Sequence, residues 1–123
     1  MPPPEQTQTV LTDLPQIRAA TITDVPAIHD LLETYASKGN LLPRSMNEIY
    51  RHLRDFFVIE LNGRIAAIGA LEIFTEDLGE VRSLVVAGEF ERRGLGRLMV
   101  QRIVAEARQI GLRRLMALTY VPA

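Results

Sequence analysis

Apolar and polar residues recur along this chain with two periods, and the two periods predict a mixture of helices and strands. Thr23 and Asp24 are typical of a helix start, and apolar residues follow them at helical spacing. A helix is therefore predicted from there to Gly39-Asn40, with one apolar face that contains Ile28, Leu31, Leu32 and Tyr35. We expect a short strand over residues 17–20 before it and a second helix over residues 46–54 after it.

The second half of the chain predicts an antiparallel meander, a helix and a last strand. Residues 56–61 are largely apolar, and the Asn62-Gly63 pair that follows is typical of a two-residue hairpin turn. Further strands are predicted over residues 65–74, 80–86 and 114–119, with a turn over residues 75–79. The helix before the last strand is expected to end at Gly111, and its apolar stripe is Leu95, Met99, Ile103, Ala107 and Ile110.

The predicted order of elements is β-α-α-β-β-β-α-β. A meander followed by a crossover helix requires a mixed, mainly antiparallel sheet with helices on its faces, which is an α/β (α+β) architecture. The 123 residues suffice for a single core. Prolines at positions 2, 3, 4 and 15 disfavour a helix. We therefore expect a flexible tail over residues 1–15 and a domain over residues 16–123.

Composition excludes several classes of function. The net charge of −1 gives no overall field for nucleic acid or an anionic membrane, and there is no basic stripe with interleaved aromatic residues. Cysteine is absent, and His29 and His52, which we expect to be packing or surface residues, do not make a metal site by themselves. Neither a secretory signal nor an apolar run of about 20 residues is present, so a cytoplasmic protein is expected.

The stretch between the strand at 80–86 and the next helix carries the candidate chemistry. Gly94 and Gly96 allow close approach of the backbone, and a helix N-terminus offers unpaired N–H groups and partial positive charge. Arg92, Arg93 and Arg97 make the local charge positive, unless they are simply a solvated face. An ATP-binding loop would end in Gly-Lys-Ser/Thr, and the dinucleotide fingerprint is longer. The pattern therefore predicts a pyrophosphate site of another kind.

The run Glu91-Arg92-Arg93-Gly94-Leu95-Gly96, taken with the order of elements, resembles the GNAT superfamily of N-acetyltransferases, whose loop reads Gln/Arg-x-x-Gly-x-Gly/Ala. The resemblance covers about residues 17–121; Glu91 replaces the usual Gln or Arg, and Gly88 replaces a common proline. It implies that acetyl-CoA is the acetyl donor, with its pyrophosphate on the loop amides, its pantetheine arm on the preceding strand and its thioester oxygen near the Val86 N–H. The residues implied are Leu84, Val85, Val86, Glu91, Arg92, Arg93, Gly94, Leu95, Gly96 and Arg97.

The same resemblance implies a general base at Glu80, because several family members have a glutamate at this position of the strand. Strand alternation puts Glu80, Arg82 and Leu84 on one face. The alternative is a strand-end glutamate paired with Arg82, and Glu72 is the second candidate for the base. An amine must lose a proton before it attacks a thioester, which is why a carboxylate is sought here.

Residues 39–45, 80–86 and 118–122 look like the amino-acid N-acetyltransferase branch, the short N-acetylglutamate synthases of arginine biosynthesis. This implies an amino-acid acceptor such as L-glutamate. Arg44 would hold a carboxylate through a bidentate fork, with Arg82 as a second candidate, unless Arg44 is an ordinary surface residue.

Family members usually continue with a helix that carries a tyrosine and with two more strands, so we expect that this chain lacks part of the acceptor half. The exposed edge of the last strand predicts a homodimer. The leading hypothesis is an acyltransferase that acts on the α-amino group of an amino acid. The alternatives are a non-catalytic acetyl-CoA-binding or regulatory module, and an enzyme that acts on another amine.

Overall fold

A sheet of five strands organises the chain in the computed structural model, which describes residues 14–36 and 44–117. The elements in chain order are β1 (Gln16–Ala19), the short 3-10 helix η2 (Ile22–Asp24), α1 (Val25–Ala36), α2 (Met46–Arg51), η3 (Leu53–Asp55), β2 (Phe56–Leu61), β3 (Arg64–Ile73), β4 (Leu78–Val86), η4 (Gly88–Phe90), α3 (Leu95–Gln109) and β5 (Arg114–Ala117). The predicted order is confirmed. The Gly39-Asn40 helix end, residues 118–119 and most of the predicted tail lie outside the described residues.

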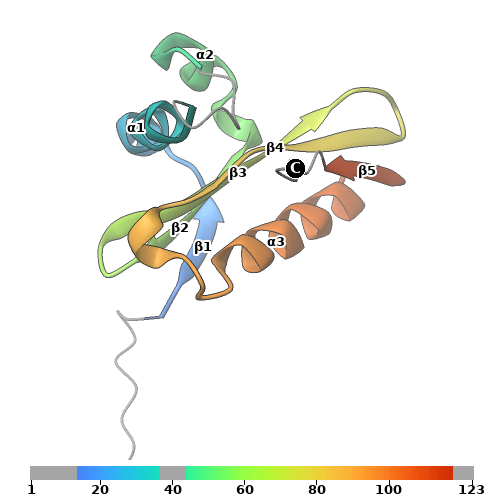
Figure 1. The fold of residues 1–123 in the computed structure, drawn as a ribbon. Coiled ribbons are helices and arrows are strands. Elements are labelled where there is room, and N and C mark those ends of the chain that lie inside the picture. Colours follow the sequence, from blue (N-terminus) through green and yellow to red (C-terminus); the bar gives the residue numbers. More distant parts are fainter. Residues whose placement is uncertain (1–13, 37–43, 118–123) are drawn as a thin grey trace, which may run out of the picture.

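The strands lie in chain order, β1-β2-β3-β4-β5. The first three pairings are antiparallel and the β4–β5 pairing is parallel, so the sheet is mixed as predicted. Figure 1 shows α3 on one face of the sheet and α1 with α2 on the other. β5 forms one edge of the described sheet, and the homodimer expected from that edge stays a prediction.

Each face of the sheet has its own apolar core. On one face, α3 packs so closely on β3 that a Cβ on Gly69 would lie 2.7 Å from Met99 Cγ, so that the Met99 side chain would have to shift. Met99 and Ile103 are fully buried there. On the other face, Ile28 and Leu32 of α1 are fully buried against the sheet, as their helical spacing predicts.

The hairpin between β2 and β3 follows from its turn residues. Asn62 and Gly63 both have positive φ, 54° and 73°, as a two-residue turn of this kind requires. The clearest differences from the sequence prediction lie at three places. The second helix ends at Arg51 and continues as η3, β4 begins at Leu78, and Ile110 is 48% exposed because it follows the last residue of α3. The left-handed Gly111, with φ of 96°, ends that helix as predicted.

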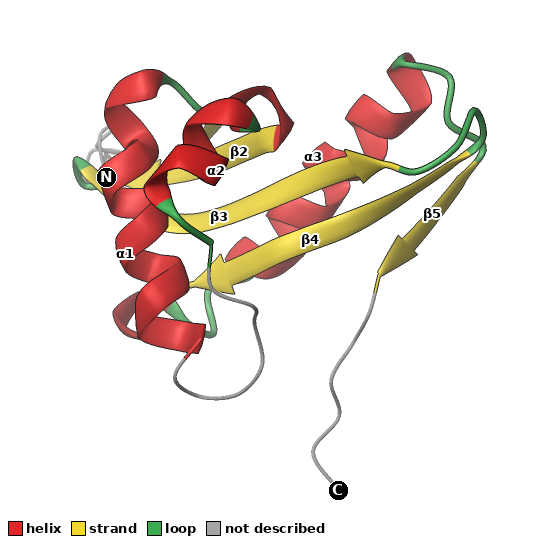
Figure 2. Cartoon of the chain, turned by 90° about the horizontal axis from the view of Figure 1, so that it is seen from above, coloured by secondary structure: helices red, strands yellow, loops and turns green. Residues whose placement is uncertain are grey.

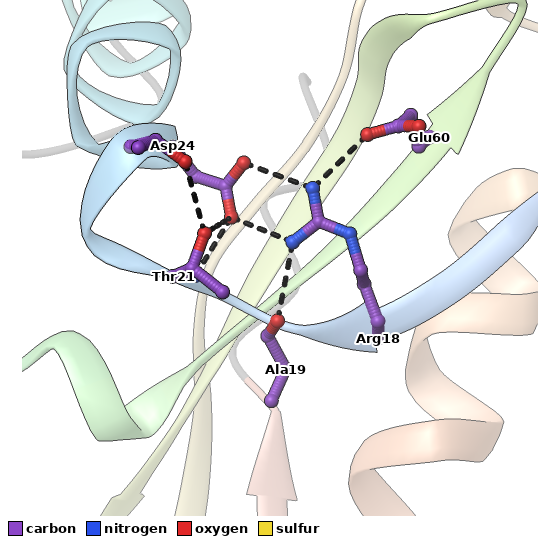
Figure 3. Close-up of polar contacts among 6 residues, drawn as sticks. Arg18, Ala19, Thr21, Asp24 and Glu60 are labelled. Atoms are coloured by element: carbon purple, nitrogen blue, oxygen red, sulfur yellow. Dashed lines mark hydrogen bonds and ion pairs between the residues drawn. The ribbon is translucent and has the colours of Figure 1, made fainter.

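The start of the first helix is held by a charged cluster of Arg18, Asp24 and Glu60 (Figure 3). The Asp24 carboxylate accepts hydrogen bonds from Arg18 at 2.7 and 3.0 Å and from the Thr21 backbone N–H at 2.7 Å. Arg18 also donates to Glu60 on β2 at 3.0 Å. Thr21 is therefore the N-cap residue of η2, two residues before the helix start that the sequence predicts at Thr23. The bonds from Arg18 hold the pKa of the buried Asp24 below its usual value.

Candidate active site

A bulge interrupts β4 at Ser83. The pairing with β3 moves from Ala70↔Arg82 to Ile68↔Val85, so two residues of β4 oppose Gly69 alone, and Ser83 has a positive φ of 54°. After the bulge, Val85 rather than Leu84 joins Ala70 in the core on the α1 face. The prediction that Leu84 shares a face with Glu80 and Arg82 was therefore wrong, because alternation does not continue through a bulge.

Among the residues that the structure describes, no strand pairs with the last part of β4 on the side away from β3, and we call this side the open edge. The last described pair with β5 is Val81↔Ala117, and Figure 2 shows β5 turning away from β4. At the end of the strand, the Ala87 N–H donates to the Ala66 carbonyl at 2.8 Å, and Val86 pairs with Ala67. In an antiparallel ladder this makes Val86↔Ala67 a non-hydrogen-bonded pair, so the N–H and C=O of Val86 point to the open edge.

The turn after β4 leads directly into the N-terminus of α3. Arg92 and Gly94 have left-handed φ values of 65° and 77°, and Gly94 is the N-cap residue. The Leu98 N–H donates to the Gly94 carbonyl at 3.0 Å, which is the first turn of the helix. The N–H groups before Leu98 therefore have no acceptor within the helix, and glycine offers no side chain to cap them. Such a helix start, with its partial positive charge, favours an anion.

The residues predicted to contact the acetyl donor differ in which of their atoms are exposed. The side chains of Val85 and Leu95 are buried in the core, so only their backbone atoms can contact a ligand. Leu84 is 38% exposed. A Cβ on Gly96 would meet only Val86 Cγ2, at an ordinary 3.7 Å. Four charged side chains of the turn and the first helical turn are exposed: Glu91, Arg92, Arg93 and Arg97.

Two carboxylates face one arginine on the middle of β4. Glu80 lies directly opposite Glu72 of β3, and like charges in that position repel each other. Arg82 lies within reach of both, since it pairs with Glu72 and places its Nε 3.7 Å from Glu80 Oε2. The hydrogen bond to Glu72 is the main cause that raises the pKa of Arg82. The Glu80 side chain is 5% exposed, so Arg82 is the cation available to this buried carboxylate.

Arg44 comes to the same face from the segment before α2. Its Nη1 donates to Ser83 Oγ at 3.4 Å, and its guanidinium lies 5.2 Å from the centre of the Phe56 ring. Asp55 also borders this region: burial raises its pKa, while the charges of His52 and Arg44 act in the opposite direction. His52 Nδ1 lies 3.6 Å from Asp55.

The structure thus brings Arg44, Glu80 and Arg82 together beside the bulge, as the sequence-based site requires. Sequence reasoning missed Ser83 and Asp55. The positive φ of Ser83 cannot be predicted from residue type, because serine rarely has a positive φ inside a strand. Asp55 lies in the short helix η3, which the sequence pattern does not distinguish from the helix before it. The described ranges contain no group of three or more His, Cys, Asp or Glu side chains that could hold a metal ion. None of the described helices is long and apolar enough to cross a membrane.

Known proteins match this chain closely. Residues 25–122 match the acetyltransferase (GNAT) family. The chain is 38% identical over 103 residues to an uncharacterized N-acetyltransferase of Chlorobaculum tepidum, covering 84% of this chain and 66% of that protein. It is 37% identical over 109 residues to an amino-acid acetyltransferase of Mycobacterium tuberculosis, covering 86% of this chain and 62% of the relative.

A solved structure supports the same relationship. The N-acetylglutamate synthase of Neisseria gonorrhoeae, complexed with coenzyme A and N-acetyl-glutamate, superposes with a TM-score of 0.83 at 33% identity, covering 86% of this chain and 25% of that one. The chain therefore spans about two thirds of the length of the first two relatives and about a quarter of this synthase. The fold has an open edge at the end of β4 and a left-handed glycine turn before α3. The family match extends over most of this fold, and it shows that the chain belongs to the acetyltransferase (GNAT) family.

Proposed function

We propose that this chain binds acetyl-CoA along the end of β4 and the turn before α3, and transfers the acetyl group to the α-amino group of an amino acid. The observation that carries the proposal is the pair of backbone sites at the end of β4. The Val86 N–H faces an open strand edge, and the unpaired amides of α3 begin after Gly94. One extended ligand with an anionic group can occupy both.

The residues of this region fit acetyl-CoA. The amides of Leu95, Gly96 and Arg97 would hold the pyrophosphate, and the exposed arginines of the turn would add positive charge against the negative charges of Glu89 and Glu91. A Cβ on Gly94 would meet nothing within 4 Å, so the turn is open on that side. The pantetheine arm would lie along the open edge near Leu84 and Val86, which brings the thioester to the Val86 N–H.

Glu80 is the proposed general base. It would take a proton from the acceptor ammonium, directly or through a water molecule, so that the neutral nitrogen attacks the thioester carbonyl carbon. The carbon–sulfur bond then breaks, and the CoA sulfur leaves and takes up a proton. The Val86 N–H would donate to the carbonyl oxygen as negative charge develops on it. Arg82, with its Nε 3.7 Å from Glu80 Oε2, would hold the Glu80 carboxylate in place.

L-Glutamate is the first candidate for the acceptor, which would assign the product to arginine biosynthesis. Two relatives support this choice, since they are named amino-acid acetyltransferase and N-acetylglutamate synthase. Arg44 would form a bidentate pair with a substrate carboxylate from its position beside Ser83. Arg82 is the second candidate, although it is already bound to Glu72 and Glu80.

One observation favours a second function, an acetyl-CoA-binding module without turnover. The Glu80 side chain is 5% exposed and lies 3.7 Å from Arg82, as expected of a structural ion pair. In that case the chain would bind acetyl-CoA, and no amine would accept the acetyl group.

A thiol-release assay with a panel of amino acids separates the two functions. Acetyl-CoA is supplied at saturation, and free CoA is measured with each amino acid and with none. The enzyme hypothesis predicts CoA release that depends on an amino acid, largest with L-glutamate. Acetyl-CoA binding without any amine-dependent release would support the module instead. A chain that does not bind acetyl-CoA in a calorimeter would contradict both.

A further inference from the structure

The β2–β3 hairpin contacts the turn before α3 through Arg64, the first residue of β3. Arg64 Nη1 donates to Glu89 Oε2 at 2.7 Å, and Nη2 pairs with the second carboxylate oxygen. The same guanidinium lies 5.5 Å from the centre of the Phe90 ring. Arg93 lies over this ring at the same distance, 5.5 Å. We call these four residues the Arg64 clasp: Arg64, Glu89, Phe90 and Arg93.

The clasp spans the part of the turn that is least favoured by backbone geometry. Arg92 has a left-handed φ of 65°, which an L-residue adopts only when its surroundings hold it there. On one side of it, Phe90 is 5% exposed and anchored in the core beneath α3. On the other side, Arg93 folds back over the Phe90 ring. The fork to Glu89 connects the same segment to the β2–β3 hairpin, directly after the two-residue Asn62-Gly63 turn.

We infer that Arg64 is a positioning residue for the pyrophosphate site: it holds the turn, through Glu89 and Phe90, in the shape that aims the α3 amides at the ligand. This inference rests on the proposed function, because it assigns the same turn to the pyrophosphate of acetyl-CoA. A site that is ordered before binding loses less conformational entropy when the ligand arrives, so a held turn binds more tightly.

A simpler account is that Arg64 acts only through its positive charge. The two accounts predict opposite changes in CoA affinity when Glu89 is substituted. If charge alone matters, Glu89→Gln removes a negative charge near the pyrophosphate and tightens binding. If the clasp positions the turn, the same substitution breaks the fork and weakens binding. Arg64→Ala weakens binding under either account, so Glu89→Gln is the decisive variant.

The test is calorimetry of CoA binding to the full chain. We expect Arg64→Ala and Glu89→Gln each to weaken binding by about three- to tenfold, as expected for the loss of an exposed ion pair with a cation–π contact. Two control variants remove the same charges from exposed positions outside the clasp: Arg108→Ala at the end of α3 and Glu76→Gln between β3 and β4. Both should bind CoA as the unaltered chain does. Gln has nearly the same size and shape as Glu, so Glu89→Gln should fold normally and remains informative even if Arg64→Ala folds poorly.

Truncated ligands separate positioning from direct contact. CoA and 3′-dephospho-CoA both contain the pyrophosphate, so Arg64→Ala should weaken both by the same factor. S-Acetylpantetheine lacks the pyrophosphate, so kcat/KM with it should not change. The inference is overturned if Glu89→Gln binds CoA as tightly as the unaltered chain or more tightly, or if the loss in Arg64→Ala is confined to CoA. An unaltered chain that binds no CoA overturns the proposed function and this inference with it.

Discussion

The C-terminal end and the middle of β4 contribute different kinds of groups to the proposed site. At its C-terminal end, the donors are backbone amides: the Val86 N–H on the open edge and the first amides of α3 after Gly94. In its middle, the groups are side chains from separate segments, since Arg44, Glu72 and Arg82 surround Glu80 and the bulge. A site made of backbone amides depends on turn geometry, whereas a site made of side chains depends on the identity of each residue.

This difference predicts which departures from the family pattern the proposed site can tolerate. Glu91 replaces a Gln or Arg in the loop, yet its side chain is exposed and the proposed donors are backbone amides. No comparable freedom exists around Glu80, which is buried and opposite a second carboxylate. Substitutions should therefore act on turnover in the middle of β4 and on acetyl-CoA affinity at its end.

The largest effect is expected for Glu80→Gln. Loss of a general base typically lowers a rate by about 10²- to 10⁴-fold, so kcat should fall by that order while acetyl-CoA affinity stays within about twofold. Steady-state kinetics over a range of pH, with calorimetry, measures both quantities. Glu72→Gln is the matched control, because it removes the other carboxylate bound to Arg82 and should cost much less. A pH–rate profile unchanged by Glu80→Gln would refute the assignment of the base.

A smaller effect, on affinity alone, is expected for Gly94→Ala. With φ at 77°, an added Cβ costs about 1–2 kcal/mol unless the turn relaxes, and relaxation moves the amides away from the pyrophosphate. We expect acetyl-CoA binding to weaken by about five- to thirtyfold. Gly111→Ala is the control, because Gly111 has φ of 96° and open space around it but lies at the other end of α3. Equal affinities for the two variants would contradict the account of the turn.

The smallest effect on function is expected for Asp24→Asn, because Asp24 belongs to a charged cluster that holds α1 and not the site. The variant should lose about 1–3 kcal/mol of unfolding free energy at neutral pH, with acetyl-CoA affinity unchanged. The folded-state pKa of Asp24 lies below the unfolded value of about 3.9, so its stabilisation is present above that value. It is lost as the pH falls through the folded value.

Urea unfolding at neutral and acidic pH measures the contribution of Asp24. The unaltered chain and Asp24→Asn should converge in stability in strong acid. Asp77→Asn is a matched control, because the hydrogen bond from Arg114 also lowers the pKa of Asp77 but the pair is exposed. A loss of stability in Asp77→Asn as large as that in Asp24→Asn would contradict the role given to burial.

Local signals account for the parts of the fold that sequence predicts well. The Asn62-Gly63 turn and the left-handed Gly111 each follow from residue types that tolerate positive φ. Gly94, which has a positive φ as well, begins the proposed anion site. The bulge at Ser83 has no such signal, since a serine at φ of 54° depends on how β3 and β4 pair. The ion pairs of Arg82 depend on the register of the same two strands, and the local pattern of apolar and polar residues does not predict that register.

Chemical-shift mapping of the labelled chain with CoA tests the central claim most directly, because it reports on individual backbone amides. We predict that the largest amide shifts fall on Val86 at the open edge and on residues 94–97 at the start of α3. In Gly94→Ala, the same amides should require a higher CoA concentration to reach half of their full shift. Shifts that gather on another face of the sheet, with Val86 and residues 94–97 unmoved at saturation, would contradict the account.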